Sequence, residues 1–100
     1  MVPTQLTTVH EVTQAIRALV DARRDRASTR REVKPAQRRV EAGQFADLYE
    51  MRAAMWSELG KAVYINDAMS DAYGLACSVA EARDRDNAKY WRERAGRRDG

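Results

Sequence analysis

The sequence predicts an all-α protein, a small antiparallel three-helix bundle in which residues 1–100 form a single domain. Apolar residues recur every three or four positions through most of the chain, and no segment alternates between apolar and polar side chains as a half-buried strand does. Glycine and proline are scarce, at 5 and 2 of 100 residues, which disfavours a turn-rich sheet protein. A chain of this length can bury a core without a disulfide or a metal.

The first predicted helix covers residues 8–26. Thr8 and Glu11 have the spacing of a capping box, in which the two side chains satisfy free backbone amides of the first turn. An apolar stripe at helical spacing follows, made of Val9, Val12, Ile16, Leu19 and Val20. The next segment is polar and contains Ser28 and Thr29, which are typical of turns and helix caps, so the first turn is expected there.

The second predicted helix covers residues 35–59. Pro35 suits the first position of a helix, where the amide that proline lacks has no partner, and Lys34 before it is biased away from helical geometry. Gly60 is expected to end the helix. Its large apolar residues mostly lie on one broad face and are Val40, Phe45, Leu48, Tyr49, Met51, Met55, Trp56 and Leu59.

Arg52 falls inside the edge of this apolar face. The simpler interpretation is that its aliphatic stem lies on the core while the guanidinium reaches water. The alternative is a buried ion pair or a contact with a partner molecule.

The third predicted helix covers residues 67–95, with Asn66 and Asp67 as candidate caps. The face expected to pack against another helix consists mostly of small side chains, namely Ile65 or Ala68, Met69, Ala72, Ala76, Val79 and Ala80. Small residues allow a neighbouring helix to approach closely. The dry core is expected to stop near Ala80, because polar residues continue the stripe beyond it.

Two alternatives concern the second turn. The second and third helices could form one long hairpin, or an uninterrupted rod over residues 35–95 that would be about 90 Å long and would require an oligomer. The terminal segments 1–7 and 96–100 are expected to be flexible. Self-association is also plausible, because a thin, alanine-rich core leaves part of a broad apolar face uncovered.

The positive charge is concentrated in the sequence. Residues 23–39 contain eight cations and two anions, a net +6, whereas the whole chain carries +3. Residues 83–100 carry a further +3, and residues 40–82 carry −5. In an up-down-up bundle, the end of the first helix, the start of the second and the end of the third share one pole. Both basic segments should therefore meet there.

A dense basic pole predicts a non-enzymatic protein that binds a nucleic-acid backbone without sequence specificity, as a subunit of a nucleoprotein or viral assembly. The predicted binding residues are Arg23, Arg24, Arg26, Arg30, Arg31, Lys34, Arg38, Arg39, Arg83, Arg85, Lys89, Tyr90, Trp91, Arg92 and Arg94. The alternative function is a protein interaction module, an adaptor or inhibitor, whose arginines dock on an acidic protein surface.

Tyr90 and Trp91 allow two interpretations. Aromatic rings among cations are typical of proteins that bind single strands, where bases stack on the rings. The simpler interpretation is that both rings pack against the first two helices.

Catalytic and metal-binding chemistry is not indicated. Cys77 is the only cysteine and His10 the only histidine, so a disulfide and a cysteine-histidine zinc site are both excluded within the chain. Cys77 is expected to be a small, partly buried residue and His10 a surface residue. No cofactor is expected. The chain lacks an apolar run long enough to span a membrane, which predicts a soluble, cytoplasmic protein.

Overall fold

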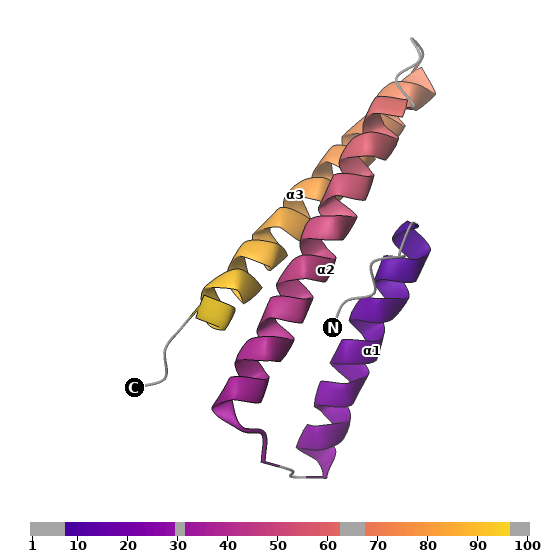
Figure 1. Cartoon of the computed structure of the whole chain (residues 1–100). Coiled ribbons are helices and arrows are strands. Elements are labelled where there is room, and N and C mark those ends of the chain that lie inside the picture. Colours follow the sequence, from indigo (N-terminus) through magenta and orange to yellow (C-terminus); the bar gives the residue numbers. More distant parts are fainter. Residues whose placement is uncertain (1–7, 30–31, 63–67, 97–100) are drawn as a thin grey trace.

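The computed structural model describes residues 8–29, 32–62 and 68–96, which fold into α1 (Val9–Ser28), α2 (Pro35–Ala62) and α3 (Ala68–Gly96) (Figure 1). No strand occurs among these residues, so the predicted all-α bundle of three helices is confirmed. Each helix begins within one residue of its predicted start and ends one to three residues beyond its predicted end.

Some predictions concern residues at the edges of the described ranges. The segments 1–7 and 97–100, expected to be flexible, lie outside the described residues, whereas Gly96 is the last residue of α3. The candidate caps Asn66 and Asp67 also lie outside them.

The central element of the bundle is α2. The antiparallel helix α3 packs on it extensively, and α1 packs against the N-terminal part of α2 (Figure 1). The backbones of α1 and α3 do not approach each other within the described ranges. Because α3 returns beside α2, the uninterrupted rod is wrong and the long hairpin is correct. The molecule measures 53 × 25 × 24 Å.

Thr8 caps α1 as predicted. Its backbone is extended, with φ −127° and ψ 153°, and its Oγ1 accepts a hydrogen bond of 3.1 Å from the backbone amide of Glu11. The Thr8 hydroxyl in turn donates to the Glu11 carboxylate at 3.1 Å. One of the free amides of the first turn is thereby satisfied, and an acidic side chain stands near the positive end of the helix dipole.

Replacing Thr8 with alanine is expected to destabilise the protein by about 1 kcal/mol, because the Glu11 amide loses its acceptor. In a domain of this size such a loss lowers the melting temperature by roughly 4–8 °C. Thermal unfolding followed by circular dichroism measures the shift. Thr8→Ser keeps the acceptor oxygen and serves as the control, so an equal loss in both variants would contradict a capping role.

The apolar core lies between α1 and α2. Its buried members are Val12, Ile16, Phe45 and Leu48. Trp91 of α3 packs against this cluster, as do Leu19 and Val20 of α1. Burial of each large side chain stabilises the fold by about 1.5–3 kcal/mol, so this small cluster holds α1 in place.

Small residues are buried on both α2 and α3. Ala42, Ala46 and Ala53 of α2 and Ala88 of α3 are buried. Gly60, predicted to end the second helix, instead lies inside α2, where an added Cβ would stand 3.4 Å from the Cβ of Cys77. The two helices can therefore pack closely along their length.

The predicted packing face of α3 is wrong for three of its residues, whereas Ala80 is half-buried and the side chains of Ile65, Ala68 and Met69 lie outside the described part of the structure. Ala72, Ala76 and Val79 are exposed, with Val79 at 51%. The helix instead buries Cys77, Asp84 and Ala88, with Trp91 half-buried on the same side. The core therefore continues about three turns beyond Ala80. Val40 of α2 is also 61% exposed and does not belong to the apolar face to which it was assigned.

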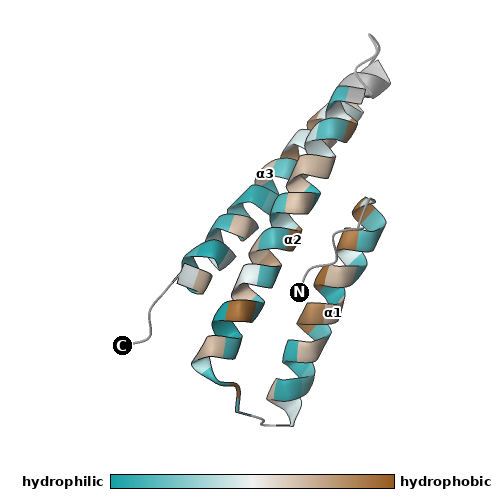
Figure 2. Ribbon diagram, in the orientation of Figure 1, coloured by the Kyte–Doolittle hydropathy of each residue, from teal (hydrophilic) through white to brown (hydrophobic). Residues whose placement is uncertain are grey.

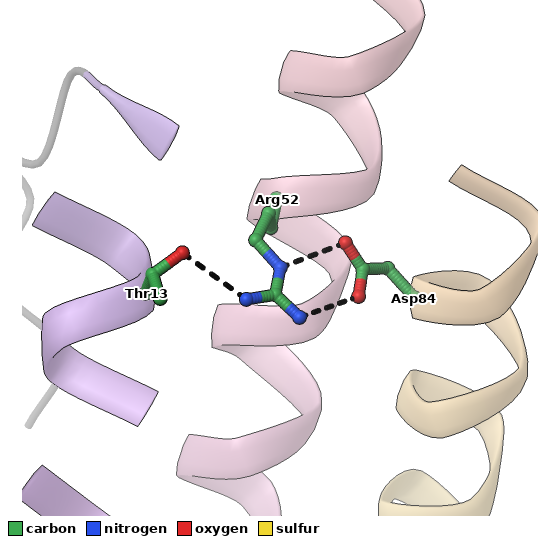
Figure 3. A network of polar contacts seen from close by, with 3 residues as sticks. All are labelled: Thr13, Arg52 and Asp84. Carbon is green, nitrogen blue, oxygen red and sulfur yellow. Dashed lines mark hydrogen bonds and ion pairs between the residues drawn. The ribbon is translucent and has the colours of Figure 1, made fainter. Parts of the chain in front are cut away.

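Arg52 joins the three helices (Figure 3). Its Nε and Nη2 donate to the two carboxylate oxygens of Asp84 on α3 at 2.9 and 2.8 Å, and its Nη1 donates to Thr13 on α1 at 3.1 Å. The Asp84 side chain is 4% exposed and that of Arg52 20%. Hydrogen bonding to Asp84 raises the pKa of Arg52, so the guanidinium remains charged. The simpler interpretation, a guanidinium in water, is wrong, and the buried ion pair is correct.

Candidate functional site

The end of α1, the start of α2 and the end of α3 lie at the same end of the molecule, as the topology predicted (Figure 1). We call this end the basic pole. A cavity of about 420 Å³ opens there, and five arginines from all three helices line it. They are Arg23 and Arg26 of α1, Arg38 and Arg39 of α2, and Arg94 of α3. We call this cavity the arginine pocket.

The remaining wall of the arginine pocket is mostly apolar. Ala27, Val33, Pro35 and Ala42 contribute to it, together with the carboxylate of Glu41. Glu41 is buried and forms an ion pair with Arg26, which connects α1 to α2. The carboxylate that lines the pocket is therefore neutralised by one of its five arginines.

An aromatic cluster supports two of the pocket arginines. Trp91 stacks on the buried Phe45 with ring centroids 4.5 Å apart. The guanidinium of Arg23 lies 5.0 Å from the centre of the Trp91 ring, and that of Arg94 lies 5.9 Å from it. Arg94 also lies 5.3 Å from the ring of Tyr90. A guanidinium that stacks on a ring keeps its N–H groups available for an oxyanion.

The structure assigns different roles to the neighbouring residues Tyr90 and Trp91. Trp91 packs against the core, as the simpler interpretation predicted, whereas Tyr90 is 51% exposed. The two rings meet edge to face at 5.1 Å. Tyr90 is therefore the ring of this pair that is available to another molecule.

Three of the predicted binding arginines are already engaged in ion pairs. Arg26 is paired with Glu41, and Arg85 with Glu81 one turn away on α3. The third, Arg92, contacts Asp47 at 2.7 Å and Glu50 at 3.0 Å on α2, and these hydrogen bonds raise its pKa. The pairs of Arg26 and Arg92 connect two helices, whereas the pair of Arg85 lies within α3. All three guanidinium groups are less available to a ligand than their charge suggests.

Seven predicted cations form no ion pair with any described residue, namely Arg23, Arg24, Lys34, Arg38, Arg83, Lys89 and Arg94. All seven are exposed. Arg30 and Arg31 lie outside the described residues. The residues of the terminal turns of α1 and α3 are mainly hydrophilic (Figure 2).

Sequence reasoning missed two residues that shape the arginine pocket. Glu41 was counted only as part of the acidic middle of the chain, and Phe45 only as a core residue. The signal for Glu41 was its position directly after two arginines and a valine at the start of α2, where it lies close to the basic turn. Nothing in the sequence indicated that Phe45 would stack with Trp91.

The described residues contain no group of cysteine, histidine and acidic side chains able to hold a metal ion. His10 is exposed on α1, as predicted, and Cys77, expected to be partly buried, is buried on α3. None of the described helices is long and apolar enough to cross a membrane.

Comparisons with protein-family models, curated proteins and solved structures find no match to this chain.

Proposed function

We propose that this protein binds a nucleic-acid backbone through the arginine pocket, without sequence specificity and as a subunit of a nucleoprotein or viral assembly. The observation that carries the proposal is the meeting of five arginines from three helices in one cavity. Arg23 and Arg94 are held there by aromatic stacking and form no ion pair with a described residue.

Phosphate groups suit this pocket for two reasons. A guanidinium presents paired N–H groups in a plane, which matches two oxygens of one phosphate, and it stays charged at every physiological pH. The pocket carboxylate, Glu41, is already neutralised by Arg26, so the pocket has a net positive charge. Arg24 and Lys34 are exposed and adjoin residues of the pocket lining in the sequence, so they can contact neighbouring phosphates along a strand.

Binding to short DNA and RNA strands is expected to weaken steeply with salt, because each phosphate contact releases counterions. For about four neutralised phosphates, the slope of log K against log salt is roughly −3, so affinity falls by about fifty-fold to a hundred-fold between ~50 and ~200 mM salt. Fluorescence anisotropy of labelled strands measures the affinity at each salt concentration and therefore the slope. The absence of binding at ~50 mM salt would contradict the proposal.

Charge reversal identifies the surface that binds. The double variant Arg38→Glu, Arg94→Glu is expected to abolish binding at low salt, because both residues line the arginine pocket. Arg17→Glu is the matched control for a single reversal, since Arg17 is exposed on α1 and does not line the pocket. Equal losses from Arg38→Glu and Arg17→Glu would indicate nonspecific attraction to net charge.

The acidic-protein alternative predicts a different result. In that case the protein retains a partner after nuclease treatment and shows no salt-dependent affinity for nucleic acid. A nuclease-treated pull-down with the wild type and the Arg38→Glu, Arg94→Glu variant distinguishes the two functions.

A further inference from the structure

We infer that the nucleic acid bound at the basic pole is single-stranded, and that Tyr90 stacks on one of its unpaired bases. This inference rests on the proposed function and adds the class of nucleic acid to it. The observation behind it is an exposed aromatic ring, held in position beside the arginine pocket, on a face of α3 that carries unpaired cations.

Two contacts position the Tyr90 ring. Trp91, itself stacked on the buried Phe45, meets it edge to face at 5.1 Å, and the guanidinium of Arg94 lies 5.3 Å from its centre. The ring is nevertheless 51% exposed. A ring that is already ordered loses little conformational entropy when a base stacks on it.

The residues around Tyr90 form a linear track. Arg83, Asn87, Tyr90 and Arg94 follow each other at intervals of three and four residues and share one face of α3. All four are exposed, and the track is about 16 Å long at 1.5 Å per residue. Arg94 belongs to the arginine pocket, while Arg83 forms no ion pair with a described residue. The order of cation, amide, ring and cation suits alternate phosphate and base contacts along one strand.

Two features disfavour a duplex on this track. Paired bases are stacked within the helix, so an exposed ring cannot stack on one unless the base is first removed from the duplex. In addition, Asp86 and Glu93 are exposed on α3 along one flank of the track. A duplex is wide enough to bring its second phosphate backbone over these carboxylates, whereas a single strand can follow the track without meeting them.

The test compares a short labelled oligothymidine, the same strand annealed to oligoadenine, and an abasic strand of equal length. Wild-type protein is expected to bind the oligothymidine on the order of ten-fold more tightly than either of the other two. Tyr90→Ala should lose that advantage and bind all three alike, whereas Tyr90→Phe should retain it. Tyr73→Ala is the matched control, because Tyr73 is also on α3 and is 45% exposed but lies ten residues before Arg83, outside the track.

The outcomes separate this inference from the proposed function. If the duplex binds as tightly as the oligothymidine, or if Tyr90→Ala leaves the affinity for the oligothymidine unchanged, the inference is wrong while backbone binding stands. If none of the three probes binds at low salt, both are wrong. Circular dichroism of Tyr90→Ala shows that any loss of affinity comes from a folded protein.

Discussion

Asp84→Ala is expected to lower the free energy of unfolding by about 3–5 kcal/mol, the typical cost of leaving one member of a buried ion pair without its partner. The Arg52 guanidinium would lose two hydrogen bonds and its counter-charge, while Thr13 would remain as its partner in the described structure. Arg52 is 20% exposed, so water can reach it only in part. This loss is a large fraction of the stability of an ordinary small domain.

Urea unfolding followed by circular dichroism measures the effect. Glu81→Ala is the control on the same helix, because Glu81 pairs with the mostly exposed Arg85 and such a pair contributes about 0.3–0.5 kcal/mol. A loss below about 1 kcal/mol for Asp84→Ala would contradict this prediction, because it would show that water replaces the hydrogen bonds that the Arg52 guanidinium loses.

The double variant Arg52→Met, Asp84→Leu tests why the pair is present. Replacing both charges with apolar groups is expected to restore most of the stability, because the cost of the single variant comes from an unpaired buried charge. We also expect the pair to fix the register of α3 on α2, because its two hydrogen bonds form at only one alignment of the helices. Poorer dispersion in the NMR spectrum of the double variant would support that role, and unchanged dispersion would contradict it.

Phe45→Ala is expected to cost about 3–5 kcal/mol, the range for truncating a buried aromatic residue. Phe45 is 1% exposed, belongs to the cluster that holds α1 on α2, and stacks on Trp91. The midpoint of urea unfolding measures the loss. Val40→Ala, at a 61% exposed position on the same helix, should change stability by less than about 0.5 kcal/mol. A similar loss in the two variants would contradict the assignment of the core.

Phe45→Ala should also weaken nucleic-acid binding under conditions in which the variant is folded. Phe45 supports Trp91, and Trp91 in turn supports the guanidinium groups of Arg23 and Arg94. Stability and binding are therefore connected at this residue.

Much of the fold followed from local patterns in the sequence. The apolar stripe of α1, the Thr8 cap and Pro35 at the first position of α2 depend on interactions within a few residues of each other, and each was predicted correctly. The basic pole was predictable as well. It depends on the linear position of the charges and on an antiparallel topology, and both are properties of the chain order rather than of individual side-chain contacts.

The packing face of α3 was decided by tertiary structure. Two sides of this helix carry small residues, and counting apolar residues favoured the side with Ala72, Ala76 and Val79. The side that is buried contains Asp84, which a count of apolar residues rejects. A carboxylate becomes acceptable inside the bundle only because Arg52 on α2 lies opposite it, and no local pattern shows that pairing.

Contacts between helices also decide which role each arginine of the basic pole has. Their number and approximate location could be read from the sequence, but their roles depend on carboxylates and rings supplied by other helices. Arg26 meets Glu41 and Arg92 meets Asp47, whereas Arg23 and Arg94 meet Trp91. Chain order brings the charges to one end of the molecule, and packing between helices determines which of them can contact a ligand.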